Sequence, residues 1–274
     1  MNAARPEMQT SSGTLIVLGC GNGAGTPAIG NNWGKCDPAE PRNRRTRASV
    51  VVRGAGKTLL VDTGPDLREQ MNRHDIADVD AVLYTHAHAD HVHGIDELTS
   101  LSRIHKRKYA AYGDRETMAE IQTSFSYMFE SKVGFYPAVI EGHILEMGVP
   151  VRFGALTVLP FAQDHGTRLS TGFRVGDMAY STDMKRLPEE SLSALRGIDT
   201  WIVDAAGYLQ EDNPVHANLR EVFAYNERIG ARRVVLTHLA RNMDYRAVSA
   251  DLPEGCELAY DGMEIEFSLR HERP

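Results

Sequence analysis

Short runs of apolar residues, bounded by glycine and polar residues, recur along the whole chain. Residues 14–19 form one such run, and residues 49–53 and 58–62 form two more, joined by the sequence Gly54-Ala55-Gly56-Lys57. Apolar and β-branched runs of this length are typical of strands, and the glycine-containing link predicts a hairpin. Further strands are expected at residues 80–85, 151–161 (a hairpin turning at Gly154), 171–175, 178–181, 200–203 and 233–237, and a final pair of strands at residues 257–260 and 263–269.

Longer stretches with mixed polar and apolar positions predict the helices. They are expected at residues 65–74, 114–125, 188–195 and 217–229. No internal repeat, low-complexity linker or composition break divides the chain, so we expect a disordered tail at residues 1–13 and a single domain at residues 14–274. Hairpins in both halves with helices between them predict an α+β fold in which outer helices cover two sheets.

Composition narrows the class of protein only a little. The hydrophobic share of 42% and the charged share of 24% are ordinary for a globular protein, and no apolar run has the roughly 18–20 residues of a membrane helix. The polar N-terminus lacks the apolar core of a secretory signal, so a cytoplasmic protein without a membrane partner is expected. A net charge of −7 argues against binding extended nucleic acid, and three scattered cysteines do not form a disulfide framework.

The most informative segment follows the apolar run at residues 80–85 and reads His86-Ala87-His88-Ala89-Asp90-His91-Val92-His93-Gly94. An extended backbone places His86 and His88 on one face, where both can bind one ion. A turn near Ala89 would direct Asp90 and His91 towards a neighbouring ion, and Gly94 would allow the close backbone approach that such a turn needs. This density of histidines predicts a metal site.

Three more candidate ligands each follow another predicted strand. His165 comes after residue 161, Asp183 after residue 181, and His238 directly after residue 237. A site with one ion needs only three protein ligands and an open position. The seven candidates therefore predict two metal ions.

These residues together resemble the metallo-β-lactamase superfamily, whose pattern is HxHxDH followed by a single His, a bridging Asp and a last His. The resemblance implies a four-layer αββα sandwich with two divalent ions. It places His86, His88 and His165 on one ion, Asp90, His91 and His238 on the other, and Asp183 between them. Leu59-Leu60-Val61-Asp62-Thr63-Gly64 is similar to the family's first motif, in which the Asp supports the metal-binding histidines.

Within the superfamily, the chain most resembles the PhnP-like cyclic phosphodiesterases of the carbon–phosphorus lyase pathway. The short interval from His165 to Asp183 leaves no room for the long arm of bacterial tRNA-processing nucleases. His216 matches the position of a histidine proposed as general acid in that family, whereas its alternative role is a solvent-facing residue at a helix start. The relatives bind a structural zinc through clustered cysteines, but only Cys36 lies in that loop here, so no third metal is expected.

The resemblance implies hydrolysis of a small phosphodiester, cyclic or nucleotide-like. Two zinc or manganese ions would activate a bridging water as the nucleophilic hydroxide, with Asp90 and Asp183 as ligands, and His216 would protonate the leaving group. The alternatives are hydrolysis of a thioester, ester or lactam, and a metal-binding carrier without activity. A homodimer is common among such relatives and is one expected assembly.

Residues that would contact the substrate are harder to predict. Arg44 and Arg47 belong to a run of arginines whose planar guanidinium groups match phosphate geometry, although such a run is often a solvated loop. Asn32 lies in the preceding polar loop. His93 either supports a ligand or faces the substrate. These four are the candidate substrate contacts.

Overall fold

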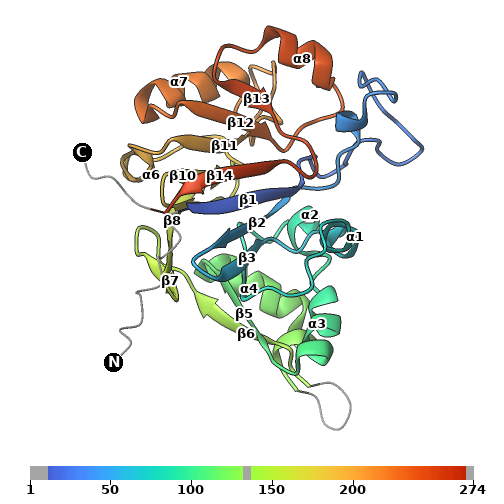
Figure 1. The fold of residues 1–274 in the computed structure, drawn as a ribbon, viewed down its shortest axis with the longest axis vertical. Coiled ribbons are helices and arrows are strands. Elements are labelled where there is room, and N and C mark those ends of the chain that lie inside the picture. Colours follow the sequence, from blue (N-terminus) through green and yellow to red (C-terminus); the bar gives the residue numbers. More distant parts are fainter. Residues whose placement is uncertain (1–11, 132–136, 270–274) are drawn as a thin grey trace, which may run out of the picture.

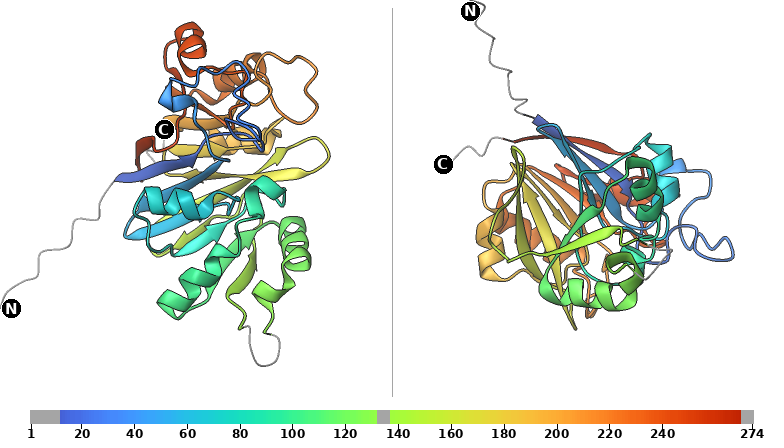
Figure 2. Two further views of the ribbon diagram at one scale, coloured as in Figure 1. Left: turned by 90° about the vertical axis from the view of Figure 1, so that its right-hand side faces the viewer. Right: turned by 90° about the horizontal axis from the view of Figure 1, so that it is seen from below.

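Two β-sheets packed face to face form the centre of the molecule, with helices on the outer side of each (Figures 1 and 2). The computed structural model describes residues 12–131 and 137–269. The first strand, β1 (Ser12–Gly19), begins two residues before the predicted position. The rest of the expected tail, residues 1–11, lies outside the described residues.

The first sheet has the strand order β14-β1-β2-β3-β4-β5-β6. Strands β14 to β3 pair antiparallel, whereas β3 to β6 pair parallel. The predicted hairpin is confirmed between β2 and β3, where Ala55 and Gly56 both have positive φ, as a tight hairpin turn requires. The other strands are β2 (Ser49–Gly54), β3 (Lys57–Val61), β4 (Ala81–Leu83), β5 (Tyr109–Gly113), β6 (Ile140–Ile144) and β14 (Glu264–Ser268).

The second sheet repeats this arrangement with the order β13-β12-β11-β10-β9-β8-β7. Strands β7 to β10 pair antiparallel and β10 to β13 pair parallel. Its strands are β7 (Val151–Phe153), β8 (Leu156–Asp164), β9 (Leu169–Val175), β10 (Met178–Ser181), β11 (Thr200–Asp204), β12 (Arg233–Thr237) and β13 (Cys256–Leu258).

Successive side chains of a strand point to opposite faces of its sheet, and this alternation explains the four layers. In β2, Val50 and Val52 belong to the core between the sheets, whereas Val51 packs with the core under the outer helices.

Among the described residues, no helix is long and apolar enough to span a membrane. The helices are α1 (Leu67–Arg73), α2 (Ala89–Val92), α3 (Glu97–His105), α4 (Arg115–Ser124) and α5 (Ser126–Phe129) on the first half, and α6 (Glu189–Leu195), α7 (Leu219–Ile229) and α8 (Tyr245–Asp251) on the second.

The α+β sandwich is therefore confirmed, with corrections to its elements. Strands β5 and β6 and helices α2, α3, α5 and α8 were not predicted; β6 lacks an apolar run, because its middle residues Glu141, Gly142 and His143 are not apolar. The last two predicted strands are not partners, because β13 pairs with β12 and β14 pairs with β1. Antiparallel pairing accounts for only half of the strand pairs in each sheet, and the first sheet contains one hairpin, between β2 and β3, among its described strands. Helix α7 begins at Leu219, with Asn218 as its capping residue, so His216 lies in the preceding loop.

The strand directions bring the predicted ligands to one edge. Strands β3, β4, β8, β10 and β12 all end at this edge, and a candidate residue follows each of them. The two sheets are joined there by a hydrogen bond of 2.8 Å from the N–H of Thr171 to the carbonyl of Thr85. The site is thus assembled between the two sheets.

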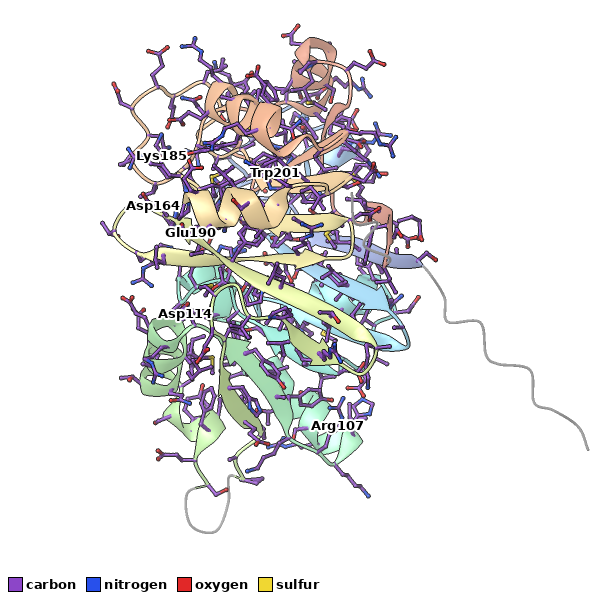
Figure 3. All side chains as sticks on the ribbon, turned by 90° about the vertical axis from the view of Figure 1, so that its left-hand side faces the viewer. Arg107, Asp114, Asp164, Lys185, Glu190 and Trp201 are labelled. Atoms are coloured by element: carbon purple, nitrogen blue, oxygen red, sulfur yellow. The ribbon has the colours of Figure 1, made fainter. Side chains whose placement is uncertain are left out.

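The two tryptophans of the chain provide a test of this packing. Trp201 on β11 is completely buried (Figure 3), and its Nε1 donates a hydrogen bond of 2.9 Å to Oγ of Ser181. We expect Trp201→Ala to lower the free energy of unfolding by about 3–5 kcal/mol, because it leaves a cavity in the hydrophobic core. Trp33→Ala, at a half-buried loop position, should cost less than about 1 kcal/mol. Denaturant unfolding followed by circular dichroism measures both, and equal losses would contradict the packing described.

Candidate metal centre

Three of the candidate residues adopt a backbone conformation that is uncommon for residues other than glycine. Asp62, Asp183 and His238 follow the ends of β3, β10 and β12, and their φ angles are 65°, 52° and 56°. Each such left-handed residue costs of the order of 1 kcal/mol or more and persists only where the surroundings enforce it. Here the turn directs each side chain into the space between the sheets, where all three are buried.

The histidine-rich segment forms a tight turn after β4. His86 lies three residues after the end of the strand, His88 has extended backbone and caps the short helix α2, and Asp90 and His91 lie on that helix. The turn packs against the loop after β3, because a side chain on Gly94 would place its first carbon 2.0 Å from the carbonyl oxygen of Gly64. The close approach predicted for Gly94 is therefore present.

The first cluster contains three histidines and one oxygen of Asp183. Nε2 of His86 lies 2.8 Å from Nδ1 of His88, so these two ring nitrogens converge on one point. Oδ1 of Asp183 lies 3.4 Å from Nε2 of His165 and 4.0 Å from Nε2 of His86. One potential ligand atom from each of the four residues falls within 4.8 Å of the others.

The second cluster lies on the other side of the same carboxylate. Oδ2 of Asp183 is 3.0 Å from Nε2 of His91 and 3.5 Å from Nε2 of His238. Oδ2 of Asp90 is 3.3 Å and 3.6 Å from the same two nitrogens. Each oxygen of Asp183 thus faces one cluster, which is the arrangement that a bridging carboxylate requires.

The outer nitrogens of the rings are held by acceptors. Nδ1 of His91 is 2.7 Å from Asp62, Nδ1 of His165 is 2.9 Å from the carbonyl of Val215, and Nδ1 of His86 is 3.0 Å from Oγ1 of Thr85. Such contacts leave Nε2 of each ring free to bind a metal. Among the described residues, Nε2 of His91 and of His238 is buried without a hydrogen-bond partner, although carboxylate oxygens lie close by. Buried nitrogens directed at shared space fit a pair of divalent cations.

The electrostatics differ between the two clusters. Burial lowers the pKa values of His86, His88 and His165, so these rings are neutral ligands at ordinary pH. Burial alone would also lower the pKa of His238, but Asp183, Asp204 and Asp90 raise it to about 10. Cations bound at this second cluster would therefore replace protons, and binding would release them.

Asp204 was not predicted, yet it joins two of the candidate histidines. It closes β11, is fully buried, and accepts hydrogen bonds from the N–H groups of Met184 (2.9 Å) and Ala206 (2.8 Å). Its carboxylate lies 2.6 Å from Nδ1 of His216 and 3.5 Å from Nδ1 of His238. Its position at the end of a buried strand was the available signal, because the other ligands occupy the same kind of position.

His216 lies directly beside both clusters. Its ring centroid is 5.1 Å from those of His165 and His238. Burial lowers the pKa of His216, but the Asp204 carboxylate raises it by more, so the net shift is upward. The ring is mostly buried and held by Asp204, which contradicts the alternative of a solvent-facing residue at a helix start.

The four candidate substrate contacts occupy different places. Asn32 and Arg47 line a cavity of about 590 Å³ beside Asp90. Arg44 is exposed and lies over the ring of Trp33, 5.1 Å from its centroid. His93 is exposed and contacts the edge of Phe125, with the ring centroids 5.8 Å apart, so it does not join the metal-site cluster.

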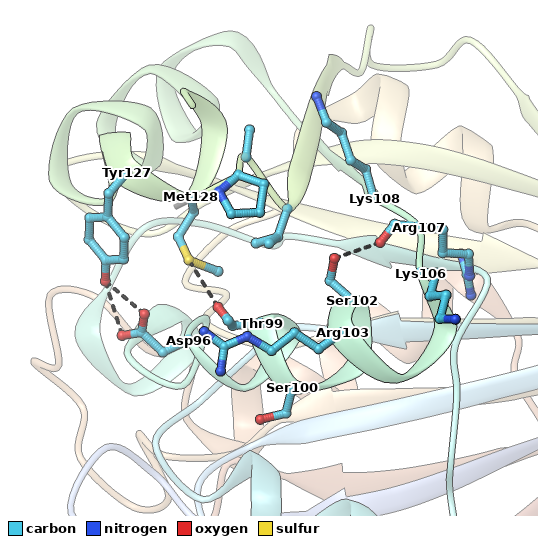
Figure 4. A pocket seen from close by; sticks show the side chains of 13 residues that line it. Asp96, Thr99, Ser100, Ser102, Arg103, Lys106, Arg107, Lys108, Tyr127 and Met128 are labelled. Atoms are coloured by element: carbon cyan, nitrogen blue, oxygen red, sulfur yellow. Dashed lines mark hydrogen bonds between the residues drawn. The ribbon is translucent and has the colours of Figure 1, made fainter. Parts of the chain in front are cut away.

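Another cavity, of about 690 Å³, lies over α3 (Figure 4). Arg103, Lys106 and Lys108 line it, together with apolar residues such as Met128 and Val139. Lys106 and Lys108 precede β5, at the opposite edge of the sheet from the histidines. This cavity is therefore separate from the candidate metal centre.

Comparison with known proteins agrees with this geometry. The model of the beta-lactamase superfamily domain matches residues 57–239, which is more than half of the chain and includes all seven candidate ligands. The chain therefore belongs to the beta-lactamase superfamily, and it is a metal-dependent hydrolase.

Its resemblance to the PhnP family is also confirmed. A crystal structure of a diphosphatase from the PhnP family is 33% identical, with a TM-score of 0.85, covering 94% of this chain and 98% of that one. A ribonuclease Z of Mycobacterium sp. is 26% identical over 261 residues, which is 82% of this chain and 92% of that protein. An octanoyltransferase of Porphyromonas gingivalis is 30% identical over 253 residues, which is 91% of this chain but only 50% of that protein. The chain thus spans half the length of this last relative.

The contact between Asp62 and His91 can be tested through metal affinity. We expect Asp62→Asn to weaken metal binding by about 10–100-fold, because an amide supports the ligating ring less well than a carboxylate does. Asparagine tolerates the left-handed backbone of residue 62, so the fold should be retained. Metal titration by calorimetry measures the effect, with Asp80→Asn, whose carboxylate pairs with Lys57, as control. Unchanged affinity in Asp62→Asn would contradict the supporting role.

Proposed function

We propose that this protein is a dinuclear metal-dependent phosphodiesterase that hydrolyses a small cyclic or nucleotide-like phosphodiester. The observation that carries the proposal is the position of His216, which lies beside both histidine clusters and is held by a buried carboxylate. Alkoxide leaving groups are strongly basic, so a proton donor at this place is what phosphodiester cleavage needs. The names of the PhnP-family diphosphatase and of the ribonuclease Z support the same chemistry.

The ligand set is suited to zinc or manganese. His86, His88 and His165 would hold one ion, Asp90, His91 and His238 the other, and Asp183 both. Divalent cations here would supply positive charge beside the scissile phosphate and lower the pKa of water. A bridging carboxylate keeps two such charges close together, which a carrier of a single ion does not need.

The protein's own residues position the proton that is transferred to the leaving group. Asp204 holds Nδ1 of His216, so the ring presents Nε2 away from the buried carboxylate. An imidazolium paired with Asp204 donates its Nε2 proton to the leaving oxygen, and the remaining neutral ring keeps its contact with the carboxylate. The N–H groups of Met184 and Ala206 hold Asp204 in place throughout.

A second candidate function is hydrolysis of a thioester or ester. The Porphyromonas gingivalis relative is named for acyl transfer, which is the observation that favours it. That name describes a protein twice as long as the matching region. A panel of phosphodiesters and acyl thioesters separates the two candidates, and turnover of thioesters alone would refute the phosphodiesterase.

Metal removal tests the dinuclear site. We expect chelation to abolish hydrolysis and added zinc or manganese to restore it. The carboxylates and imidazoles of the site cannot themselves supply the positive charge of a divalent cation. Elemental analysis should find two ions per chain. His88→Ala should lower this content, whereas His143→Ala, a residue of the partly exposed strand β6, should not. Full activity after chelation, or one ion per chain, would contradict the proposal.

The general-acid role of His216 can be separated from a structural one. We expect His216→Gln to lower kcat by roughly 10²–10⁴-fold on a phosphodiester with an alkoxide leaving group. On a nitrophenyl ester the loss should be below about tenfold, because that leaving group needs little protonation. Metal content of the variant serves as the control for an intact site. Equal losses on both esters would show that His216 does not act as the acid.

A further inference from the structure

Lys185 is a buried cation that belongs to neither histidine cluster. It lies two residues after Asp183 and is only 5% exposed (Figure 3). Its Nζ donates to both oxygens of the Glu221 carboxylate on α7, each over 2.8 Å. A buried ammonium group is stable only when it is paired, and this carboxylate compensates its charge. The pair therefore joins the turn after β10 to the first turn of α7.

Glu221 also fixes the point at which the chain enters α7. Its Oε2 accepts the N–H of Asn218 over 2.9 Å, and its own N–H donates to Oδ1 of Asn218 over 3.0 Å. This reciprocal capping box holds the residue two positions after His216. Burial alone would raise the pKa of Glu221, but Lys185 and the N–H of Asn218 lower it by more, so the carboxylate is ionised.

The backbone beside His216 is tied to the same turn by a second contact. The N–H of Ala217 donates to the carbonyl of Met184 over 2.8 Å, and Met184 lies between Asp183 and Lys185. A single hydrogen bond fixes the distance between two segments but leaves them free to rotate about it. The ion pair of Lys185 removes that freedom, because it acts at a different point of the same two segments.

The loop that carries His216 has little other support along its middle. It joins β11 to α7, and residues 209–212 are exposed, with Leu209 at 70%. Exposed residues add few packing contacts that would hold a loop in one position. The position of His216 therefore depends on the anchors at the two ends of the loop, which are Asp204 on β11 and the start of α7.

Asp183 has contacts of its own that do not involve this ion pair. Oγ of Ser170 donates to its carbonyl over 2.8 Å, and Oγ1 of Thr182 lies 2.8 Å from its carboxylate. Loss of the ion pair would thus release the loop of His216 while the bridging carboxylate stays in place. The two effects can be separated by experiment.

From these contacts we infer that Lys185 and Glu221 are positioning residues for His216, and that their ion pair holds the end of the loop from which this histidine reaches the leaving group. The inference rests on the proposed function, because a proton from His216 matters only for an ester whose leaving group is basic. Proton transfer requires hydrogen-bond distance, and a displacement of about 1 Å can lower a rate by up to about 10²-fold. The ion pair acts on this step and not on metal binding.

Two esters that differ only in the leaving group test the inference. They are the methyl and the para-nitrophenyl esters of thymidine 5′-phosphate. We expect Lys185→Met to lower kcat about tenfold on the methyl ester and less than about twofold on the nitrophenyl ester, which needs little protonation. Arg228→Met, which removes an ion pair with Glu189 from the other end of α7, should change neither value. Equal losses on both esters, or none, would overturn the inference.

A second variant tests whether the two residues act as a pair. Glu221→Gln should also lower kcat about tenfold on the methyl ester, and it decides the question if Lys185→Met does not fold. The double variant should again lose about tenfold, because one interaction can be removed only once. A loss of about a hundredfold in the double variant would show that the residues act separately.

Hydrogen exchange distinguishes failure of the inference from failure of the proposed function. If the wild-type protein hydrolyses neither ester, the proposed function fails, and the exchange of backbone amides still tests the positioning. We expect Lys185→Met to raise the exchange rate of residues 215–219 about tenfold, because this end of the loop loses an anchor, whereas Arg228→Met should not. Exchange of these amides at the wild-type rate in Lys185→Met would overturn the inference.

Discussion

Buried carboxylates impose the main constraint on this molecule. Asp62 and Asp204 are fully shielded from solvent and Asp183 nearly so, and an ionised carboxylate in such surroundings costs several kcal/mol unless donors or cations surround it. Thr85 supplies its N–H and its hydroxyl to Asp62, and the N–H groups of two residues hold Asp204. Asp183 instead lies among imidazoles. The edge of the sandwich is therefore stable only when distant strand ends meet in register.

That constraint links stability with function. The same imidazoles that compensate Asp183 are the candidate metal ligands, and the left-handed turns at Asp62, Asp183 and His238 are costs that the surroundings must offset. Divalent cations bound here would complete this compensation, because they would replace protons on rings whose pKa values the carboxylates raise. The folded protein is thus organised in advance for cations at this edge.

Much of the fold followed from local pattern. The hairpin of β2 and β3 carries turn residues with the required φ angles, and alternation in β2 places Val51 apart from Val50 and Val52. The pattern was not informative where a strand is short and mostly exposed, as in β6, whose middle residues are not apolar. It also predicted β13 and β14 as a pair, because neighbours in sequence usually pair, whereas each instead completes a different sheet.

The sequence alone determined which residues could bind metal, because ligation depends on side-chain chemistry and each candidate follows a recognisable strand. It did not identify Asp204, because its position at a strand end is a signal that many acids share, and only the fold shows that two histidines lie against it. Nor did it reveal the cavity beside Asp90, which joins residues 23–32 to Arg47 and Arg241. Tertiary structure decided both features, since burial and electrostatic partnership depend on which distant segments the two sheets bring together.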